Sequence, residues 1–186
     1  MSLIDFNLNN NKHRSILITG IAGTGKTSIC QELNKRAYQA FSIEDLPGIY
    51  TRIDKRNGQV FENYDANDLE SVQQSSWICN QDKLVDFMDQ HQKGIVFYGG
   101  VASNLDDIRP LFDIVFMLEA DINVLRQRLN KRHSSDFAHS PLVQEWLFAH
   151  KNDWENHMRK GAIVINDNEN LTEVVDKIIE QTQKII

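Results

Sequence analysis

The sequence predicts an α/β protein of three layers, in which a five-stranded parallel sheet lies between two layers of helices. Three observations predict this fold. Short apolar runs alternate with longer amphipathic stretches, which is the pattern of repeated βαβ units. The 186 residues are 41% hydrophobic and 25% charged, values typical of one globular domain. Proline and glycine are sparse, at 3 and 9 residues, so most of the chain is expected to be regular structure.

The expected strands are apolar and rich in β-branched residues, as buried parallel strands are. They are expected at residues 15–19, 39–43, 94–98, 113–118 and 162–165. Helices are expected where apolar side chains recur at helical spacing, at residues 26–38, 121–132, 141–160 and 171–185. A long insertion, residues 44–93, separates the second and third strands and is expected to be mostly helical in its second half. Residues 1–12 are expected to be a flexible N-terminus, and residues 13–186 a single domain.

Charge and cysteine usage restrict the partners and the compartment. Lys plus Arg is 20 and Asp plus Glu is 26, which gives a net charge of −6. An acidic chain lacks the bulk positive field that attracts nucleic acid or an anionic membrane, so neither is expected as a partner. No apolar run approaches the roughly 20 residues that span a bilayer, and the polar N-terminus has no apolar signal core. Cys30 and Cys79 have no metal-like spacing. We therefore expect two free thiols and a cytoplasmic protein.

A glycine-rich loop follows the first expected strand. Its sequence is Gly20-Ile21-Ala22-Gly23-Thr24-Gly25-Lys26-Thr27, which fits the phosphate-binding pattern G-x-x-x-x-G-K-[ST]. Glycines let successive N–H groups converge on one anion, and the helix that begins near Lys26 adds its N-terminal dipole. The Lys26 ammonium can reach β- and γ-phosphates, and the Thr27 hydroxyl can ligate Mg²⁺. Residues 20–28, which include Ser28, therefore predict a nucleotide site. The alternative is a turn that merely joins strand to helix.

With this loop, the chain resembles the small P-loop kinases, the family that includes adenylate, shikimate and gluconate kinases. The resemblance covers residues 14–186 and implies a P-loop NTPase fold, ATP and Mg²⁺, an acceptor-binding insertion at residues 44–93 and a lid at residues 133–150. The segment Leu125–Arg132 is similar to the family's R-L-x-x-R segment, read at Arg128 and Arg132. The resemblance implies that Arg128 lies against adenine and that Arg132 contacts phosphate. Their spacing of four places both on one helical face. The alternative is a solvated basic helix face.

Three further segments carry the resemblance at strand ends. Gly99-Gly100 is similar to the glycine pair that shikimate kinases place against substrate, although it could simply end a strand. Asp45 follows the second strand, where shikimate-type kinases carry acids that face metal and acceptor. We therefore expect Asp45 to orient or deprotonate the acceptor, or to hold Mg²⁺ through water, with a helix cap as the alternative. Residues 166–168, Asn-Asp-Asn, resemble the loop whose backbone wraps adenine.

The chain also departs from these kinases at named positions. Tyr98 stands where adenylate kinases carry an acid, and Glu44-Asp45 lacks the D-x-D spacing of shikimate kinases. The expected lid contains no arginine or lysine, so it is short or weakly catalytic. In the acceptor insertion, Arg52 could grip an anionic group and Trp77 could stack on a ring. The alternatives are a solvated hairpin for Arg52 and a core position for Trp77.

Three functions follow from these observations. The favoured one is an ATP- and Mg²⁺-dependent phosphotransferase that acts on a small metabolite such as a nucleoside, a nucleotide or a sugar acid. A second is an NTP-hydrolysing switch with a protein partner, although Asp45 and Glu119 are the only acids at expected strand ends that could serve it. A third is a nucleotide sensor without catalysis, which Tyr98 and the absence of arginine and lysine from the lid suggest. The sequence does not define the acceptor or the oligomeric state.

Overall fold

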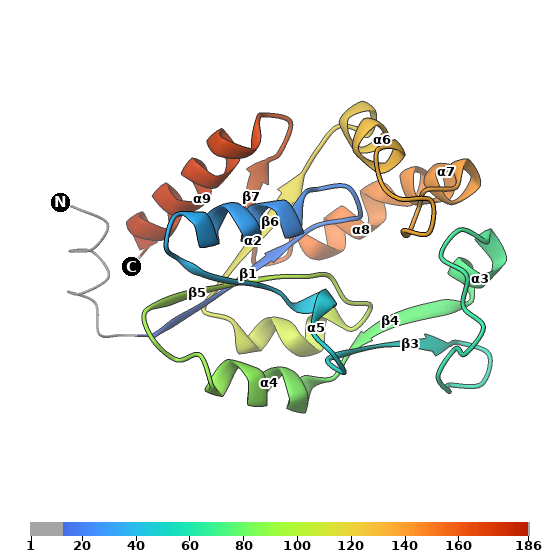
Figure 1. Cartoon of the computed structure of the whole chain (residues 1–186), viewed down its shortest axis with the longest axis horizontal. Helices are drawn as coiled ribbons and strands as arrows, with labels where there is room; N and C mark the ends of the chain where they lie inside the picture. Colours follow the sequence, from blue (N-terminus) through green and yellow to red (C-terminus); the bar gives the residue numbers. More distant parts are fainter. Residues whose placement is uncertain (1–12, 186) are drawn as a thin grey trace.

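A five-stranded parallel sheet forms the centre of the computed structural model, which describes residues 13–185 (Figure 1). The expected flexible N-terminus, residues 1–12, lies outside the described residues. The strands run in the order β2-β5-β1-β6-β7, and neighbouring strands pair in parallel. Their bounds are β1 (Arg14–Thr19), β2 (Gln39–Ser42), β5 (Ile95–Gly99), β6 (Ile114–Glu119) and β7 (Ile163–Asn166). The predicted parallel sheet is confirmed, and each strand lies within about one residue of its predicted range.

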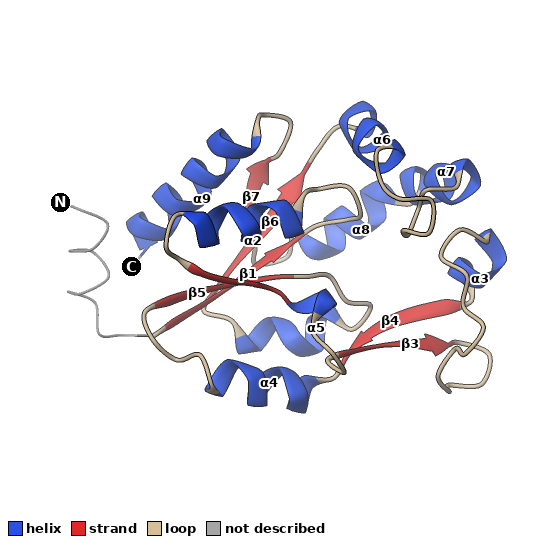
Figure 2. Ribbon diagram, in the orientation of Figure 1, coloured by secondary structure: helices blue, strands red, loops and turns tan. Residues whose placement is uncertain are grey.

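Helices cover both faces of this sheet, as Figure 2 shows. Helices α2 (Lys26–Lys35) and α9 (Leu171–Ile185) pack on one face, against a buried cluster that includes Ile16, Ile18 and Phe97. Leu17 and Tyr98 belong to the cluster on the other face. Because successive strand residues point to opposite faces, β1 contributes to both clusters. The second cluster includes side chains from α4 (Gln81–Asp89), α5 (Leu105–Ile108), α7 (Pro141–Ala149) and α8 (Lys151–Met158). The predicted three layers are confirmed.

The strand order places the first loop at a switch point of the sheet. From β1 the chain moves to one side to form β2 and β5, and to the other side to form β6 and β7. In open α/β sheets, ligands bind beyond the carboxyl ends of the strands at such a point. The fold therefore positions residues 20–27 at the place where a ligand is expected.

A second, two-stranded sheet was not predicted. Strands β3 (Tyr50–Asp54) and β4 (Ser75–Cys79) pair antiparallel within the insertion at residues 44–93. β4 interrupts the stretch that was expected to be mostly helical, and it separates α3 (Leu69–Gln73) from α4. The side chains of Asp68 and Asn80 each accept a backbone hydrogen bond at the start of these helices. Such N-caps begin a new helix, so the two helices remain separate.

Of the four predicted helices, α9 matches its range of 171–185, and the other three are shorter or divided. The helix expected at residues 121–132 is α6 (Ile122–Asn130), and the one expected at 141–160 divides into α7 and α8 at His150. α2 ends at Lys35, before Ala37 takes a left-handed φ of 64°. Short 3₁₀ turns lie at η1 (Ile43–Asp45) and η2 (Arg109–Leu111). Within residues 13–185, no helix has the length and apolar character needed to cross a membrane.

Candidate active site

Residues 20–27 connect β1 to α2 in the conformation of an anion-binding loop. Gly23 and Gly25 have φ values of 93° and 73°, a region that glycine enters without steric penalty. A Cβ on Gly20 would lie 2.6 Å from the Thr24 hydroxyl and 2.9 Å from the Leu118 carbonyl oxygen. No side chain caps the N-terminus of α2, so its first N–H groups are available to an anion. The loop geometry thus requires the glycines that the pattern specifies.

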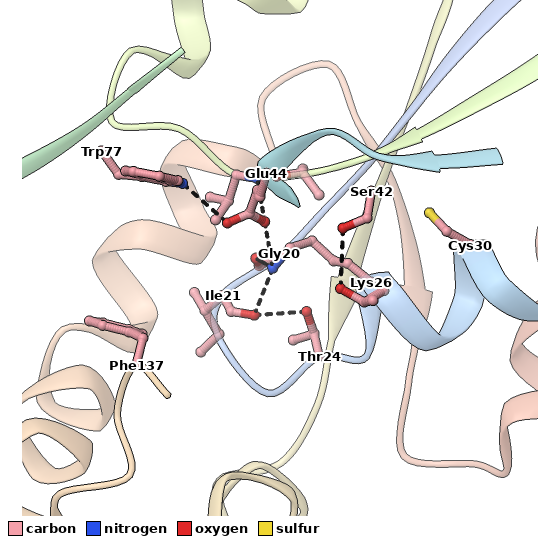
Figure 3. Close-up of polar contacts among 12 residues, drawn as sticks. Gly20, Ile21, Thr24, Lys26, Cys30, Ser42, Glu44, Trp77 and Phe137 are labelled. Carbon is pink, nitrogen blue, oxygen red and sulfur yellow. Dashed lines mark hydrogen bonds and ion pairs between the residues drawn. The ribbon is translucent and has the colours of Figure 1, made fainter. Parts of the chain in front are cut away.

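The Lys26 side chain folds back over this loop (Figure 3). Its ammonium donates to the Gly20 carbonyl oxygen at 2.9 Å and lies 3.6 Å from Glu44 Oε1. The Lys26 side chain is only 10% exposed, so its charge is directed into the site rather than into bulk solvent. Lys26 therefore places a positive charge at the centre of the loop, where phosphate oxygens would be neutralised.

Glu44 carries a carboxylate that faces Lys26. It lies in η1, directly after β2, and its carboxylate accepts from Trp77 Nε1 at 3.2 Å and from the Val101 amide at 3.1 Å. Glu44 thereby joins the loop to β4 and to the segment after β5. The sequence favours its neighbour Asp45, whose side chain is exposed. Adjacent residues of a 3₁₀ turn point about 120° apart, so the sequence could not show which of the two acids faces Lys26.

Asp45 nevertheless lies close to the first turns of α2. Burial raises the pKa of the Cys30 thiol to about 12, and the Asp45 carboxylate adds to this rise. Thr27 and Ser42 lie nearby, with their hydroxyl oxygens 3.3 Å apart. Thr27 and Ser28 are exposed at the start of α2. Ser42 was missed by sequence reasoning, although its position at the carboxyl end of β2 is the signal that could have identified it.

Arg128 joins three segments at the other end of the loop. It donates to the Gly23 carbonyl oxygen at 3.3 Å, forms an ion pair with the Asp167 carboxylate and donates to the Asp167 carbonyl oxygen at 2.9 Å. Asp167 is 3% exposed. Burial raises its pKa to about 6, although the neighbouring Arg128 acts in the opposite direction. The sequence predicts only a backbone role for residues 166–168, so the Asp167 side chain is an addition to the site.

Arg132 occupies different surroundings. α6 ends at Asn130, and Arg132 lies beyond it, where its guanidinium donates to the Phe137 carbonyl oxygen at 3.4 Å. The expectation that Arg128 and Arg132 share one helical face is therefore wrong. The Arg132 amide bonds to the Leu129 carbonyl oxygen three residues earlier, a tight turn that takes the chain out of the helix. Arg132 thus lies in the turn that follows α6.

Arg52 is held between aromatic rings in the insertion at residues 44–93. Its guanidinium carbon lies 4.4 Å from the centre of the Tyr64 ring and 4.5 Å from that of Trp77. Arg52 Nε is buried without a hydrogen-bond partner, and burial lowers the pKa of this arginine. Arg56, by contrast, is exposed and pairs with Asp54 at the turn. The solvated hairpin expected as the alternative thus describes Arg56 and not Arg52.

Trp77 is already in contact with other side chains of the site. Its ring stacks on Tyr50 with the ring centres 5.0 Å apart, and it also contacts Arg52. Its indole N–H donates to Glu44. Because these contacts use both its ring and its polar group, Trp77 holds Arg52 and Glu44 in place in this structure.

Gly99 and Gly100 allow close packing at the end of β5. A Cβ on Gly99 would lie 2.6 Å from Cys30 Sγ, and one on Gly100 would lie 2.7 Å from Ile43 Cγ1. The glycine pair therefore lets α2 and η1 approach β5, which brings Glu44 to the loop. Tyr98, just before the pair, is fully buried, and burial raises its pKa to about 12. Within residues 13–185, no group of three or more metal-ligating His, Cys, Asp or Glu side chains occurs.

The fold and the loop define the class: this is an α/β protein with a phosphate loop after the first strand of a parallel sheet. The match to the AAA domain family covers residues 16–140. The chain therefore belongs to the AAA domain family.

Solved structures with a similar fold include three kinases. Shikimate kinase from Acinetobacter baumannii in complex with shikimate is 12% identical, with a TM-score of 0.62 over 96% of this chain and 97% of that one. Deoxyadenosine kinase from M. mycoides is 16% identical, with a TM-score of 0.56 over 92% and 100%. A gluconokinase from Sinorhizobium meliloti is 15% identical, with a TM-score of 0.51 over 95% of each chain. The fold of the small P-loop kinases is thus confirmed.

Proposed function

We propose that this protein is a phosphotransferase that moves the γ-phosphoryl group of ATP, bound with Mg²⁺, to a small-molecule acceptor such as a nucleoside, a nucleotide or a sugar acid. One observation carries the proposal. Lys26 Nζ and Glu44 Oε1 lie 3.6 Å apart beside the loop. The Lys26 ammonium can neutralise phosphate charge, and the Glu44 carboxylate can accept a proton. Both groups therefore lie at the position where the γ-phosphoryl group would be transferred.

The residues of the loop fit a magnesium–nucleotide complex. Left-handed glycines, the uncapped N-terminus of α2 and the Lys26 ammonium are suited to a polyphosphate. We propose that residues 20–28 hold the phosphates, and that Thr27 ligates Mg²⁺ while Asp45 holds it through water. When bound, the nucleotide complex supplies an electrophilic phosphorus. Arg128 and the 166–168 backbone would lie against adenine, and Arg132 would reach phosphate from the lid.

The acceptor would lie between Glu44 and the insertion. Glu44 can take the proton of an acceptor hydroxyl as that oxygen attacks, while Lys26 neutralises the charge of the transferring group. Arg52 is positioned to bind an anionic group of the acceptor, because its guanidinium is half-buried and has no carboxylate partner among the described residues. Trp77 would hold Arg52 and contact the acceptor at the ring edge. Gly99 and Gly100 would form the wall beside it.

Replacing Lys26 tests the site. In a screen of nucleosides, nucleotides, sugars and sugar acids with Mg²⁺ and ATP, we expect Lys26→Ala to lower phosphoryl transfer by at least about 10²-fold, because the developing charge loses its partner. Circular dichroism should show an intact fold. Wild-type turnover in this variant would rule out the proposed site. Phosphate release that no acceptor changes would instead indicate a hydrolase, and tight ATP binding with no transfer would indicate a sensor.

The two neighbouring acids provide a matched pair for the same assay. Glu44→Gln should lower transfer by about 10²- to 10⁴-fold, the range for a lost general base, with the ATP dissociation constant little changed. Asp45→Asn should raise the Mg²⁺ concentration needed for half-maximal transfer, and at saturating Mg²⁺ it should retain more of the wild-type rate than Glu44→Gln does. The opposite ranking of the two variants would assign the proton acceptor to Asp45.

A further inference from the structure

One side chain of the acceptor insertion binds the backbone of the lid. Asn67 lies in the loop between β3 and α3, and its amide nitrogen donates to the carbonyl oxygens of Ser134 at 3.0 Å and Asp136 at 3.1 Å. Its amide oxygen accepts from the Ser140 N–H at 2.7 Å. The Ala138 amide adds a bond of 3.4 Å to the Ala66 carbonyl oxygen. Residues 67 and 134–140 are far apart in the sequence, so these contacts join two separate segments.

The chemistry of this contact is specific to a side-chain amide. The lid segment between α6 and α7 consists of turns, which leave backbone donors and acceptors without strand or helix partners. Asparagine carries two donors and an acceptor on one short side chain, and Asn67 uses both functions here. Between its bonded residues, Ala138 is fully buried with a left-handed φ of 61°. The lid is thus held in one defined conformation over this loop.

The loop that carries Asn67 also covers Arg52. Tyr64, three residues before Asn67, lies over the Arg52 guanidinium. Hydrogen bonds restrain the chain between them. The backbone N–H of Asp65 donates to the Ser71 hydroxyl at 2.9 Å, and the backbone N–H of Asn67 donates to the Asp65 carboxylate at 2.8 Å. On the lid side, Phe137 packs against the apolar cluster to which Ile21 of the phosphate loop belongs.

We propose that Asn67 is a positioning residue that fastens the lid to the acceptor insertion, so that the lid and the cover of Arg52 move together. This inference rests on the proposed function. If an anionic acceptor binds at Arg52, the lid closes over the phosphates in the same conformational change, because Asn67 connects the two segments. Asn67 acts through the backbone of residues 134–140 and does not itself touch the reacting atoms.

Hydrogen–deuterium exchange on the full chain without nucleotide tests the fastening. In Asn67→Ala we expect exchange of the Ser140 and Ala138 amides to rise about tenfold, together with that of Tyr64 and Asp65, because both segments lose their common contact. Asn67→Asp keeps the acceptor for the Ser140 amide, so Ser140 should stay protected. Asn63→Ala is the matched control, since Asn63 is an exposed residue of the same loop and should leave exchange unchanged.

Three results would overturn the proposal. Unchanged exchange at residues 138–140 in Asn67→Ala would show that the side chain does not hold the lid. Faster exchange in the lid alone would show that the two segments move independently. An equal rise in exchange in Asn63→Ala would show that any weakening of this loop has the same effect, and that the Asn67 contact is not specific. Because the measurement needs neither ATP nor acceptor, its failure is distinct from failure of the phosphotransferase assignment, which the Lys26 and Glu44 variants test.

Discussion

At the scale of single residues, Asp167 is a buried carboxylate beside the phosphate loop. A Cβ on Gly25 would lie 3.8 Å from its Oδ2, and its ion pair with Arg128 connects β7 to α6. Burial disfavours its ionised form more than Arg128 and the more distant Lys26 favour it. The ion pair therefore holds Arg128 against the loop, but it requires a negative charge in a buried position where desolvation disfavours it.

This balance makes stability depend on pH. The folded-state pKa of Asp167, about 6, exceeds the unfolded value of 3.8, so the folded chain binds the proton more tightly. Stability from the protonated form is fully present below pH of about 4 and is lost as pH rises through about 6. Urea unfolding of the wild type and of Asp167→Asn, compared from about pH 4 to 7, should show the wild type becoming less stable relative to the variant. A constant difference would contradict the raised pKa.

The residues that the sequence could identify are those whose partners are local. The loop at residues 20–27 is defined by spacing along the chain, and its geometry follows from its glycines. Glu44, Asp167 and Asn67 were missed because their partners are distant in sequence: Val101, Arg128 and the backbone of Ser140. Such contacts depend on how elements pack, which no local pattern contains.

At the scale of elements, the approach of α2 to β5 decides where the loop lies. The sequence predicts both elements from their apolar periodicity, but it offers two interpretations of Gly99-Gly100. The space beside Gly99 is filled by Cys30 of α2, so packing is sufficient reason for this glycine. The β3–β4 sheet could not be predicted, because its five-residue strands are polar at several positions and gain their stability from tertiary contacts.

A pair of substitutions measures this packing. Gly99→Ala places a Cβ about 2.6 Å from Cys30 Sγ, so we expect a loss of unfolding free energy of about 1–3 kcal/mol. Adding Cys30→Ala removes the sulfur and should restore part of that loss, giving a non-additive cycle. Denaturant unfolding of the two single variants and the double variant provides the numbers. Additive effects would show that the strand end shifts without meeting α2.

At the scale of the whole molecule, the site lies where the two apolar clusters meet the carboxyl ends of the strands. β1 contributes Ile16 and Ile18 to one cluster and Leu17 to the other, and the loop begins directly after this strand. The loop is therefore anchored by a strand that packs into both clusters. The alternation of strands and helices in the sequence was enough to predict these layers. It could not predict that the insertion is attached to residues 134–140 through Asn67.

Binding at such a place should stabilise the entire fold. At about 100 times its dissociation constant, Mg–ATP should raise the free energy of unfolding by about 2.7 kcal/mol, since it binds only the folded chain. The thermal midpoint should rise accordingly in the wild type and much less in Lys26→Ala. Equal stabilisation of both proteins by Mg–ATP would place the nucleotide somewhere other than the loop.

The indole of Trp77 has an experimental use that follows from its surroundings. It is one of three tryptophans, and the other two, Trp146 and Trp154, lie together in α7 and α8 with ring centres 5.0 Å apart. With those two replaced by phenylalanine, the remaining emission would come from a ring bonded to Glu44 and touching Arg52. Small molecules could then be ranked optically by whether they disturb that fluorophore, before any turnover is detected.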